Sequence, residues 1–121
     1  MAVTSDNMSV PPDFSIVIPV YNEEGILSAS IADLISKLAD SKKLTDDTYE
    51  IILSANGCVD RTVDIARRLR EKYPGIVLLQ SDEPNYGKAL KQGIRAARGK
   101  YVVCDEIDLC DVDFYERALY R

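Results

Sequence analysis

The sequence predicts an α/β protein with a mostly parallel sheet of about four strands and helices on both faces. Two observations support this class. Short strand patterns alternate with helical patterns along the chain, and such alternation favours parallel strands joined by packed helices. The first strand pattern, FSIVIPV at 14–20, is a nearly continuous apolar and β-branched run, which is typical of a strand buried on both faces.

Each predicted strand is short. The four strands cover residues 14–20, 49–53, 76–79 and 101–104. Pro19 cannot donate a ladder hydrogen bond, so regular pairing is expected to stop near the end of the first strand. Residues 1–13 are polar and contain Pro11-Pro12, and we expect them to form a disordered lead-in to one domain at 14–121.

Apolar side chains at three- and four-residue spacing predict four helices. They cover about 26–38, a stretch after Asp60, about 88–98, and a stretch after Asp113. Asn22 and Asp60 are expected to cap the first two helices with their side chains. Gly99 closes the third, and Asp113 with Glu116 resembles a capping box that opens the last.

The composition excludes several classes of function. The net charge of −5 argues against nucleic-acid binding through a general basic surface, and the absence of histidine removes the commonest general base and the usual zinc ligand. Cys58, Cys104 and Cys110 form no CxxC pair, which indicates free thiols in a reducing compartment. No signal peptide and no apolar run of about 20 residues is present, so the chain is expected to be cytoplasmic and without a membrane segment.

Polar side chains follow each predicted strand. Ligands of open α/β sheets bind beyond the carboxyl ends of the strands, so these side chains are expected to converge on one crevice. Loops are polar by default, and a solvated surface therefore remains the alternative. The residues concerned are Tyr21, Asn22, Glu23, Ser54, Asn56, Asp82, Glu83, Asn85, Lys88, Asp105, Glu106 and Asp108.

Six acids and no basic residue lie within 105–116. Carboxylates packed this closely repel one another, and a divalent cation with oxygen ligands relieves the repulsion. Asp108 and Glu106 directly follow a buried strand and are the metal-ligand candidates, whereas Asp105 receives no role. The remaining acids are interpreted as helix caps or solvated surface: Asp111, Asp113 and Glu116.

Lys88 and Tyr21 leave two interpretations open. Lys88 lies near a helix start, where its ammonium and free backbone N–H groups suit a phosphate, but without further context an ordinary surface lysine is the favoured interpretation. Tyr21 is either a core aromatic or a stacking platform for a base. Neither GxGxxG nor GxxxxGK[ST] occurs, which disfavours a dinucleotide site and a P-loop.

Four sequence blocks carry a resemblance to a known family. They are SIVIPVYNEE (15–24), EIILSANGCVDRT (50–62), NYGKALKQGI (85–94) and GKYVVCDEIDL (99–109). In this order they resemble family 2 glycosyltransferases with the GT-A fold, and the resemblance covers nearly everything from residue 14 onward. It implies the Rossmann-like, nucleotide-sugar-binding half of that fold, with a nucleotide-diphosphate sugar bound over the strand ends.

The resemblance also implies roles for individual residues. Pro19, Tyr21 and Glu23 line the nucleotide pocket, and Lys88 belongs to the donor-binding set. Asn56 falls where the family usually has an aspartate that contacts the base. Because an amide donates as well as accepts, either a base other than the usual uridine or a lower affinity is expected.

Glu106-Ile107-Asp108 falls on the family's DxD motif, with glutamate in place of the first aspartate. The resemblance implies that Asp108 ligates Mg²⁺ or Mn²⁺. It also implies that Glu106 assists in binding this cation, directly or through water, and that Glu106 belongs to the donor-binding set. The ion offsets the charge that develops on the departing diphosphate.

Members of this family continue well beyond the length of this chain, into the half that binds the acceptor and supplies the catalytic base. The resemblance therefore implies hexosyl transfer to an unknown acceptor by an enzyme of which this chain is an incomplete part. The chain is expected to be a fragment, a truncated gene product, or a donor-binding remnant that needs a partner chain or an oligomer, and the chain alone is expected to be inactive. A non-catalytic nucleotide-sugar-binding remnant or scaffold domain is the alternative, and the altered Asn56 and Glu106 favour it.

Overall fold

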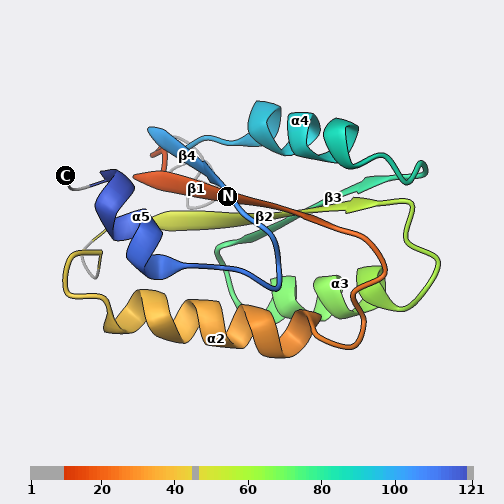
Figure 1. Cartoon of the computed structure of the whole chain (residues 1–121), viewed down its shortest axis with the longest axis horizontal. Coiled ribbons are helices and arrows are strands. Elements are labelled where there is room, and N and C mark those ends of the chain that lie inside the picture. The colour runs from red at the N-terminus through yellow and green to blue at the C-terminus, as the bar shows by residue number, and fades with distance from the viewer. Residues whose placement is uncertain (1–9, 45–46, 120–121) are drawn as a thin grey trace, which may run out of the picture.

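A computed structural model describes residues 10–44 and 47–119, and it confirms the α/β class. Four parallel strands form one sheet in the order β3-β2-β1-β4. Helix α4 covers one face, and α2 and α3 cover the other, with α5 beside α2 (Figure 1). The elements are β1 (Phe14–Val20), α2 (Leu27–Asp40), β2 (Tyr49–Asn56), α3 (Thr62–Lys72), β3 (Ile76–Ser81), α4 (Tyr86–Ala96), β4 (Tyr101–Cys104) and α5 (Val112–Leu119).

Most of the expected lead-in, residues 1–9, lies outside the described residues. Within the rest of it, Pro12 is buried, and the N–H of Asp13 donates to the carbonyl of Thr48 at 3.0 Å. The carboxylate of Asp13 in turn accepts from the N–H of Thr48 at 2.9 Å. The approach to β1 is therefore bonded to the approach to β2.

Strand β1 is the centre of the sheet, and all of its residues are buried, as its apolar run predicts. It pairs with β2 along its whole length but with β4 only as far as Val17. The carbonyl of Val17 accepts from Asp105 N–H, so this edge of β1 faces β4. Pro19 lies two residues further along β1, so its backbone nitrogen faces the same edge of the strand. Pairing with β4 has already ended at this position. The missing N–H of Pro19 therefore removes no ladder hydrogen bond, and pairing with β2 continues past it.

Helix α2 packs its apolar side against the sheet through Leu27, Ile31, Leu34 and Leu38. Each of these side chains is at most 2% exposed. Burial of one such side chain stabilises a fold by about 1.5–3 kcal/mol. The helical spacing read from the sequence is therefore also the spacing that holds α2 on the sheet.

The prediction that Asn22 caps α2 is wrong. Asn22 has a φ of 49°, and its Oδ1 accepts from the N–H groups of Val59 and Asp60 at 2.9 and 3.4 Å. The helix begins at Leu27, whose N–H donates to the carbonyl of Glu23, and no side chain caps it. The short polar side chain of asparagine tolerates this left-handed conformation and ties the loop after β1 to the loop after β2.

The predicted capping box at Asp113 is also wrong. Helix α5 begins at Val112, and Oδ1 of Asp111 accepts the N–H of Phe114 at 3.2 Å. Glu116 does not reach back to the start of the helix, because its carboxylate accepts from the hydroxyl of Ser41 at the end of α2. The tertiary contact with α2 therefore replaces the local one.

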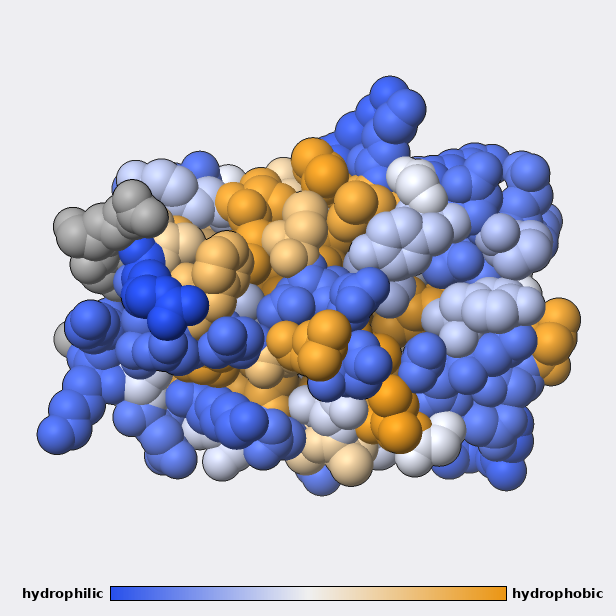
Figure 2. Space-filling view, viewed as in Figure 1, coloured by the Kyte–Doolittle hydropathy of each residue, from blue (hydrophilic) through white to orange (hydrophobic). Residues whose placement is uncertain are grey.

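Strand β4 lies at one edge of the sheet, and of its residues only Val103 is buried. Figure 2 shows apolar surface gathered between α4 and α5, over the region that β4 occupies in Figure 1. Tyr101 and Val102 of β4 are 61% and 41% exposed. Among the described residues, no helix is long and apolar enough to cross a membrane.

Candidate functional site

The connections of β1 and β4 leave the sheet on opposite faces. From β1 the chain crosses through α2 and α3 on one face, whereas it reaches β4 through α4 on the other (Figure 1). The carboxyl ends of two such neighbouring strands form a topological switch point, where open α/β sheets bind ligands. Residues 21–26 follow β1 at this point, and residues 105–111, here named the acidic loop, follow β4.

Carboxylates from three loops act on one another at the switch point. Burial, and after it the negative charges of Asp108 and Asp60, raise the pKa of Glu23 above its ordinary value. These three residues come from the loops that follow β1, β2 and β4. The structure thus brings Glu23 and Asp108, both predicted from the sequence, within electrostatic reach of each other.

Glu106 and Asp108 are both exposed, and the residue between them, Ile107, is 5% exposed and belongs to the core. The buried Ile107 anchors the middle of the acidic segment while its two neighbours face solvent. Within the described part of the chain, no ion pair or side-chain hydrogen bond engages either carboxylate. The same residues contain no group of three or more His, Cys, Asp or Glu suited to hold a metal ion. The protein therefore offers an exposed carboxylate pair rather than a complete cage.

Asp105 has a role that the sequence did not reveal. Its Oδ1 accepts the N–H of Glu106 at 2.9 Å, and its Oδ2 accepts the N–H of Asp111 at 3.2 Å. Oδ2 also accepts the hydroxyl of Tyr115 at 2.8 Å. Asp105 thus closes the acidic loop on itself and joins it to α5. Tyr115 was missed because nothing in a helical pattern marks one buried aromatic as a hydrogen-bond donor.

Cys110 adds a second closure of the acidic loop. Its thiol donates to the carbonyl of Glu106 with an S···O distance of 3.3 Å. Burial, and after it the charge of Asp105, raise the pKa of the Cys110 thiol to about 11. The thiol is therefore protonated at neutral pH and available as a weak donor.

Asn56, the predicted base-contacting residue, is 4% exposed at the end of β2. Its amide nitrogen donates to the carbonyl of Val20 at 3.0 Å, which joins the ends of β1 and β2. Gly57 follows with a φ of +65°, and a Cβ at this position would lie 2.5 Å from the nitrogen of Pro84. Glycine is required there because the loops after β2 and β3 approach each other so closely.

Asp60 and Thr62 support the same region from the start of α3. Oδ1 of Asp60 accepts the N–H of Thr62 at 2.9 Å, although the N-cap position itself is Arg61. The hydroxyl of Thr62 accepts the N–H of Glu23 at 2.7 Å. Burial alone would raise the pKa of Asp60, but hydrogen bonds from Thr62 and from the N–H of Glu24 hold that pKa below its ordinary value. The backbone of Glu23 is therefore fixed by α3.

The remaining predicted residues differ in accessibility. Tyr21 is 47% exposed at the end of β1, whereas Pro19 is buried within the strand. The Nζ of Lys88 pairs with Oε1 of Glu83 at 2.8 Å and lowers the pKa of Glu83. Asn85 caps α4 by accepting the N–H of Lys88, so the helix begins at Tyr86 rather than at Lys88. A phosphate at this helix must therefore compete with Glu83 for the ammonium of Lys88.

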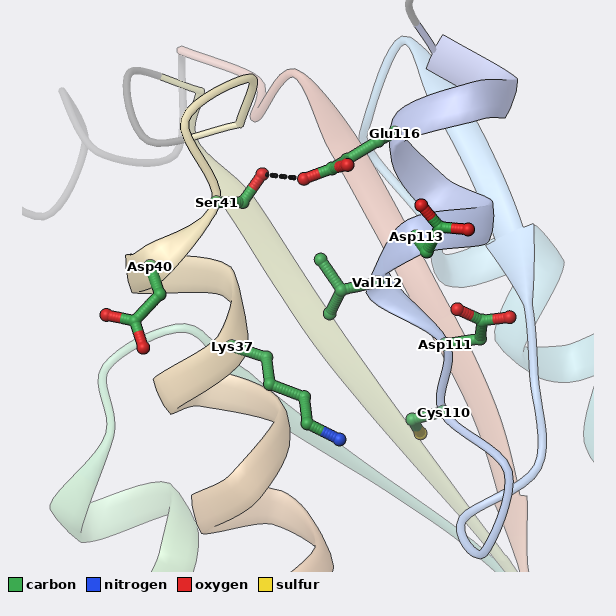
Figure 3. Close-up of a pocket in the computed structure, with 8 residues that line it drawn as sticks. All are labelled: Lys37, Asp40, Ser41, Cys110, Asp111, Val112, Asp113 and Glu116. Carbon is green, nitrogen blue, oxygen red and sulfur yellow. Dashed lines mark hydrogen bonds between the residues drawn. The ribbon is translucent and has the colours of Figure 1, made fainter.

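A separate groove of about 430 Å³ lies between α2 and α5 (Figure 3). Its lining residues are Lys37, Asp40, Ser41, Cys110, Asp111, Val112, Asp113 and Glu116. The hydrogen bond from Ser41 to Glu116 crosses it, and Lys37 pairs with Asp33 at 2.8 Å. Cys110 and Asp111 at the end of the acidic loop line this groove, but Glu106 and Asp108 do not, so the groove does not contain the two metal-ligand candidates.

Solved structures identify the class of fold. The mannosyltransferase PcManGT from Pyrobaculum calidifontis, solved in complex with GDP-Man and Mn²⁺, superposes with a TM-score of 0.71 at 22% sequence identity. The match covers 92% of this chain and 32% of that protein. The chain therefore has the GT-A glycosyltransferase fold.

Sequence comparisons identify the family. The sequence profile of glycosyl transferase family 2 matches residues 15–113, and the chain belongs to this family. A dolichyl-phosphate beta-glucosyltransferase from Dictyostelium discoideum is 36% identical over 98 residues, which cover 78% of this chain and 30% of the relative. Glycosyltransferase AglD from Haloferax volcanii is 33% identical over 111 residues, which cover 90% of this chain and 18% of the relative. The chain thus spans less than a third of the length of these relatives.

Proposed function

We propose that the chain binds a nucleotide-diphosphate sugar together with Mg²⁺ or Mn²⁺ at the carboxyl ends of β1 and β4. The observation that carries this proposal is the convergence of Glu23 and Asp108 at the switch point of a family 2 chain. The bound donor serves sugar transfer to an acceptor that the chain does not identify. The solved mannosyltransferase with GDP-Man and Mn²⁺ supports the choice of ligands to test first.

The acidic loop fits a divalent cation by its chemistry. Asp108 and Glu106 offer hard oxygen donors that no protein cation neutralises within the described residues. Mg²⁺ and Mn²⁺ typically use one or two carboxylates and take their other ligands from water and substrate phosphates. We assign Asp108 as the ligand of the cation and Glu106 as a second carboxylate that assists in binding it. The cation supplies charge to offset the diphosphate of the donor.

We assign the nucleotide to the surface between the loops that follow β1 and β2. Tyr21 presents an exposed ring for stacking, while Pro19 and Glu23 shape the pocket beside it. Asn56 contacts the base from the end of β2, and its bond to Val20 limits how far its amide can turn. The ammonium of Lys88 leaves Glu83 and binds a phosphate of the nucleotide-diphosphate sugar, which is a stronger partner.

A second candidate function is nucleotide-sugar binding without transfer, as a remnant or scaffold domain. Two departures from the family pattern favour it. Asn56 stands where the family usually has a base-contacting aspartate, and Glu106 replaces the first aspartate of the DxD motif. Because the chain spans less than a third of the compared relatives, we expect the purified chain to bind the donor without transferring its sugar.

Titration with GDP and UDP, each with and without Mn²⁺, tests the donor site. Binding is expected to tighten with Mn²⁺, and Asp108→Ala is expected to weaken the Mn²⁺-dependent part by roughly tenfold or more, because a ligand to the cation is lost. Asp113→Ala is the matched control, since it removes an equal charge from an exposed residue that pairs with Arg117 on α5. Mn²⁺-independent binding would favour the scaffold function, and no binding of either nucleotide would refute the donor site.

A further inference from the structure

The carboxylate of Asp105 joins both ends of the acidic loop to α5. Asp105 receives donors from the start of the loop at Glu106, from its end at Asp111, and from α5 at Tyr115, at 2.9, 3.2 and 2.8 Å. Both oxygens of Asp105 are therefore engaged by donors. This occupancy separates Asp105 from Glu106 and Asp108, whose carboxylates have no such donors among the described residues.

Tyr115 gives this arrangement a fixed point in the core. Its ring is 0% exposed and packs in the main hydrophobic cluster, so its hydroxyl has little freedom to move. The hydroxyl donates to Asp105, and the N–H of Tyr115 donates to the carbonyl of Asp111 at 3.2 Å. Tyr115 is thus bonded to both ends of the acidic loop.

We infer that Asp105 and Tyr115 are a positioning pair that holds Glu106 and Asp108 in place for the cation of the donor site. The inference rests on the proposed function. Metal ligands are commonly oriented by hydrogen bonds from a second layer of residues, and the loss of such a bond weakens metal binding. Asp105 acts here through the backbone of its neighbours and is not itself assigned as a ligand.

The bonds of Asp105 explain why a conservative change there should matter. Asparagine has one acceptor oxygen and one donor group in place of the two acceptor oxygens of aspartate. Whichever way its amide turns, the NH₂ group faces the N–H of Glu106 or the N–H and hydroxyl donors of Asp111 and Tyr115. At least one of the bonds that close the loop must therefore break.

The test compares Asp105→Asn and Tyr115→Phe with two matched controls, Asp113→Asn and Tyr101→Phe. Asp113 is an exposed acid on α5, and Tyr101 is an exposed tyrosine on β4. The readout is the ratio of GDP and UDP affinities measured with and without Mn²⁺ at a temperature where every variant is folded. Asp105→Asn is expected to lower this ratio roughly tenfold. Tyr115→Phe is expected to lower it about threefold, as for the loss of one hydrogen bond, and both controls are expected to leave it unchanged.

The ratio separates positioning from stability. A residue with only a structural role lowers the melting temperature but leaves the effect of Mn²⁺ on nucleotide affinity unchanged. If wild-type binding depends on Mn²⁺ and neither variant changes the ratio by more than about twofold, the positioning pair is refuted while the donor site stands. If the wild-type chain shows no Mn²⁺-dependent binding, both proposals fail. Should Asp105→Asn not fold, Tyr115→Phe alone decides, since it removes only a hydroxyl from the core.

Discussion

The two ends of the sheet use the same kind of side chain in opposite ways. At the amino end, Glu50 is 4% exposed, and its carboxylate accepts from the hydroxyl of Ser15 and the N–H of Arg98, both at 2.7 Å. At the carboxyl end, Glu106 and Asp108 are exposed and receive no such donors within the described chain. A buried acid surrounded by donors stabilises the fold, whereas exposed acids that converge leave their charge available to a ligand.

This contrast extends to the backbone around each end. Gly99 donates its N–H to Oγ of Ser15 at 2.9 Å, and a Cβ at Gly99 would lie 2.6 Å from the backbone of Phe14 and Ser15. The amino end is therefore closed by direct backbone packing. At the carboxyl end Gly57 makes a similar close approach to Pro84, but the loops after β1 and β2 are joined by the side chain of Asn22, which accepts from the N–H of Val59.

Gly99→Ala is expected to have the largest effect on stability. The added methyl group must displace the backbone of β1, so we expect a loss of about 3 kcal/mol or more in the free energy of unfolding. Urea denaturation followed by circular dichroism measures it. A loss below about 1 kcal/mol would mean that the backbone at the amino end can move aside for the added methyl group.

Glu50→Gln is expected to cost about 2 kcal/mol. The Ser15 hydroxyl and the Arg98 N–H reach the same oxygen, so an amide oxygen can still accept from both, but without the charge of the carboxylate both bonds weaken, and the ion pair with Arg98 is lost. The same urea experiment measures the change. As a control, Glu71→Gln alters an exposed glutamate on α3 and is expected to stay within about 0.5 kcal/mol of wild type. Equal effects of the two substitutions would contradict a structural role for Glu50.

Asp108→Asn is expected to have the smallest effect on stability and the opposite sign. The charge of Asp108 helps to raise the pKa of Glu23, so its removal should move that pKa down toward the ordinary value. A carboxyl with a raised pKa loses stability as the pH rises through that pKa, because the folded state then holds an unfavourable charge. The variant should therefore gain at most about 0.5 kcal/mol at neutral pH, after solvent screening, and nothing below the ordinary pKa of glutamate.

Carboxyl ¹³C NMR titration of Glu23 in both proteins measures the shift directly. Asp111→Asn serves as the control, because Asp111 lies in the same acidic loop but does not contribute to the raised pKa of Glu23. An unchanged pKa of Glu23 in Asp108→Asn would show that the loops after β1 and β4 do not converge.

The elements of the fold could be predicted from the sequence because their signals are local. The apolar run of β1 and the helical spacing of α2 each specify one element without reference to the rest of the chain. The strand order β3-β2-β1-β4 has no such local signal, and we did not predict it from the sequence. The predicted caps were wrong where a side chain bonds to a distant partner: Asn22 accepts from Val59, and Glu116 accepts from Ser41.

The candidate site was predictable only in part for the same reason. Asp108 and Glu23 stand in recognisable blocks at strand ends, and the structure places their charges together. The engagement of Asn56 by Val20 and of Lys88 by Glu83 depends on packing between loops, which residue spacing does not encode. The sequence does not distinguish Asp105 from the other acids at 105–116, because two of its three hydrogen-bond donors, Asp111 and Tyr115, come close to it only in the folded chain.

The position of β4 at the edge of the sheet has a consequence for the behaviour of the chain in solution. The N–H groups of Tyr101 and Asp105 point toward β1, so the alternate residues Val102 and Cys104 direct their backbone groups outward. No strand in the described part of the chain covers that side, and an uncovered strand of this kind is a template for aggregation. The net charge of −5 opposes such stacking at low ionic strength, and salt screens that repulsion. The colloidal stability of the purified chain is therefore expected to depend on the four residues of the edge strand β4 and to fall as salt is added.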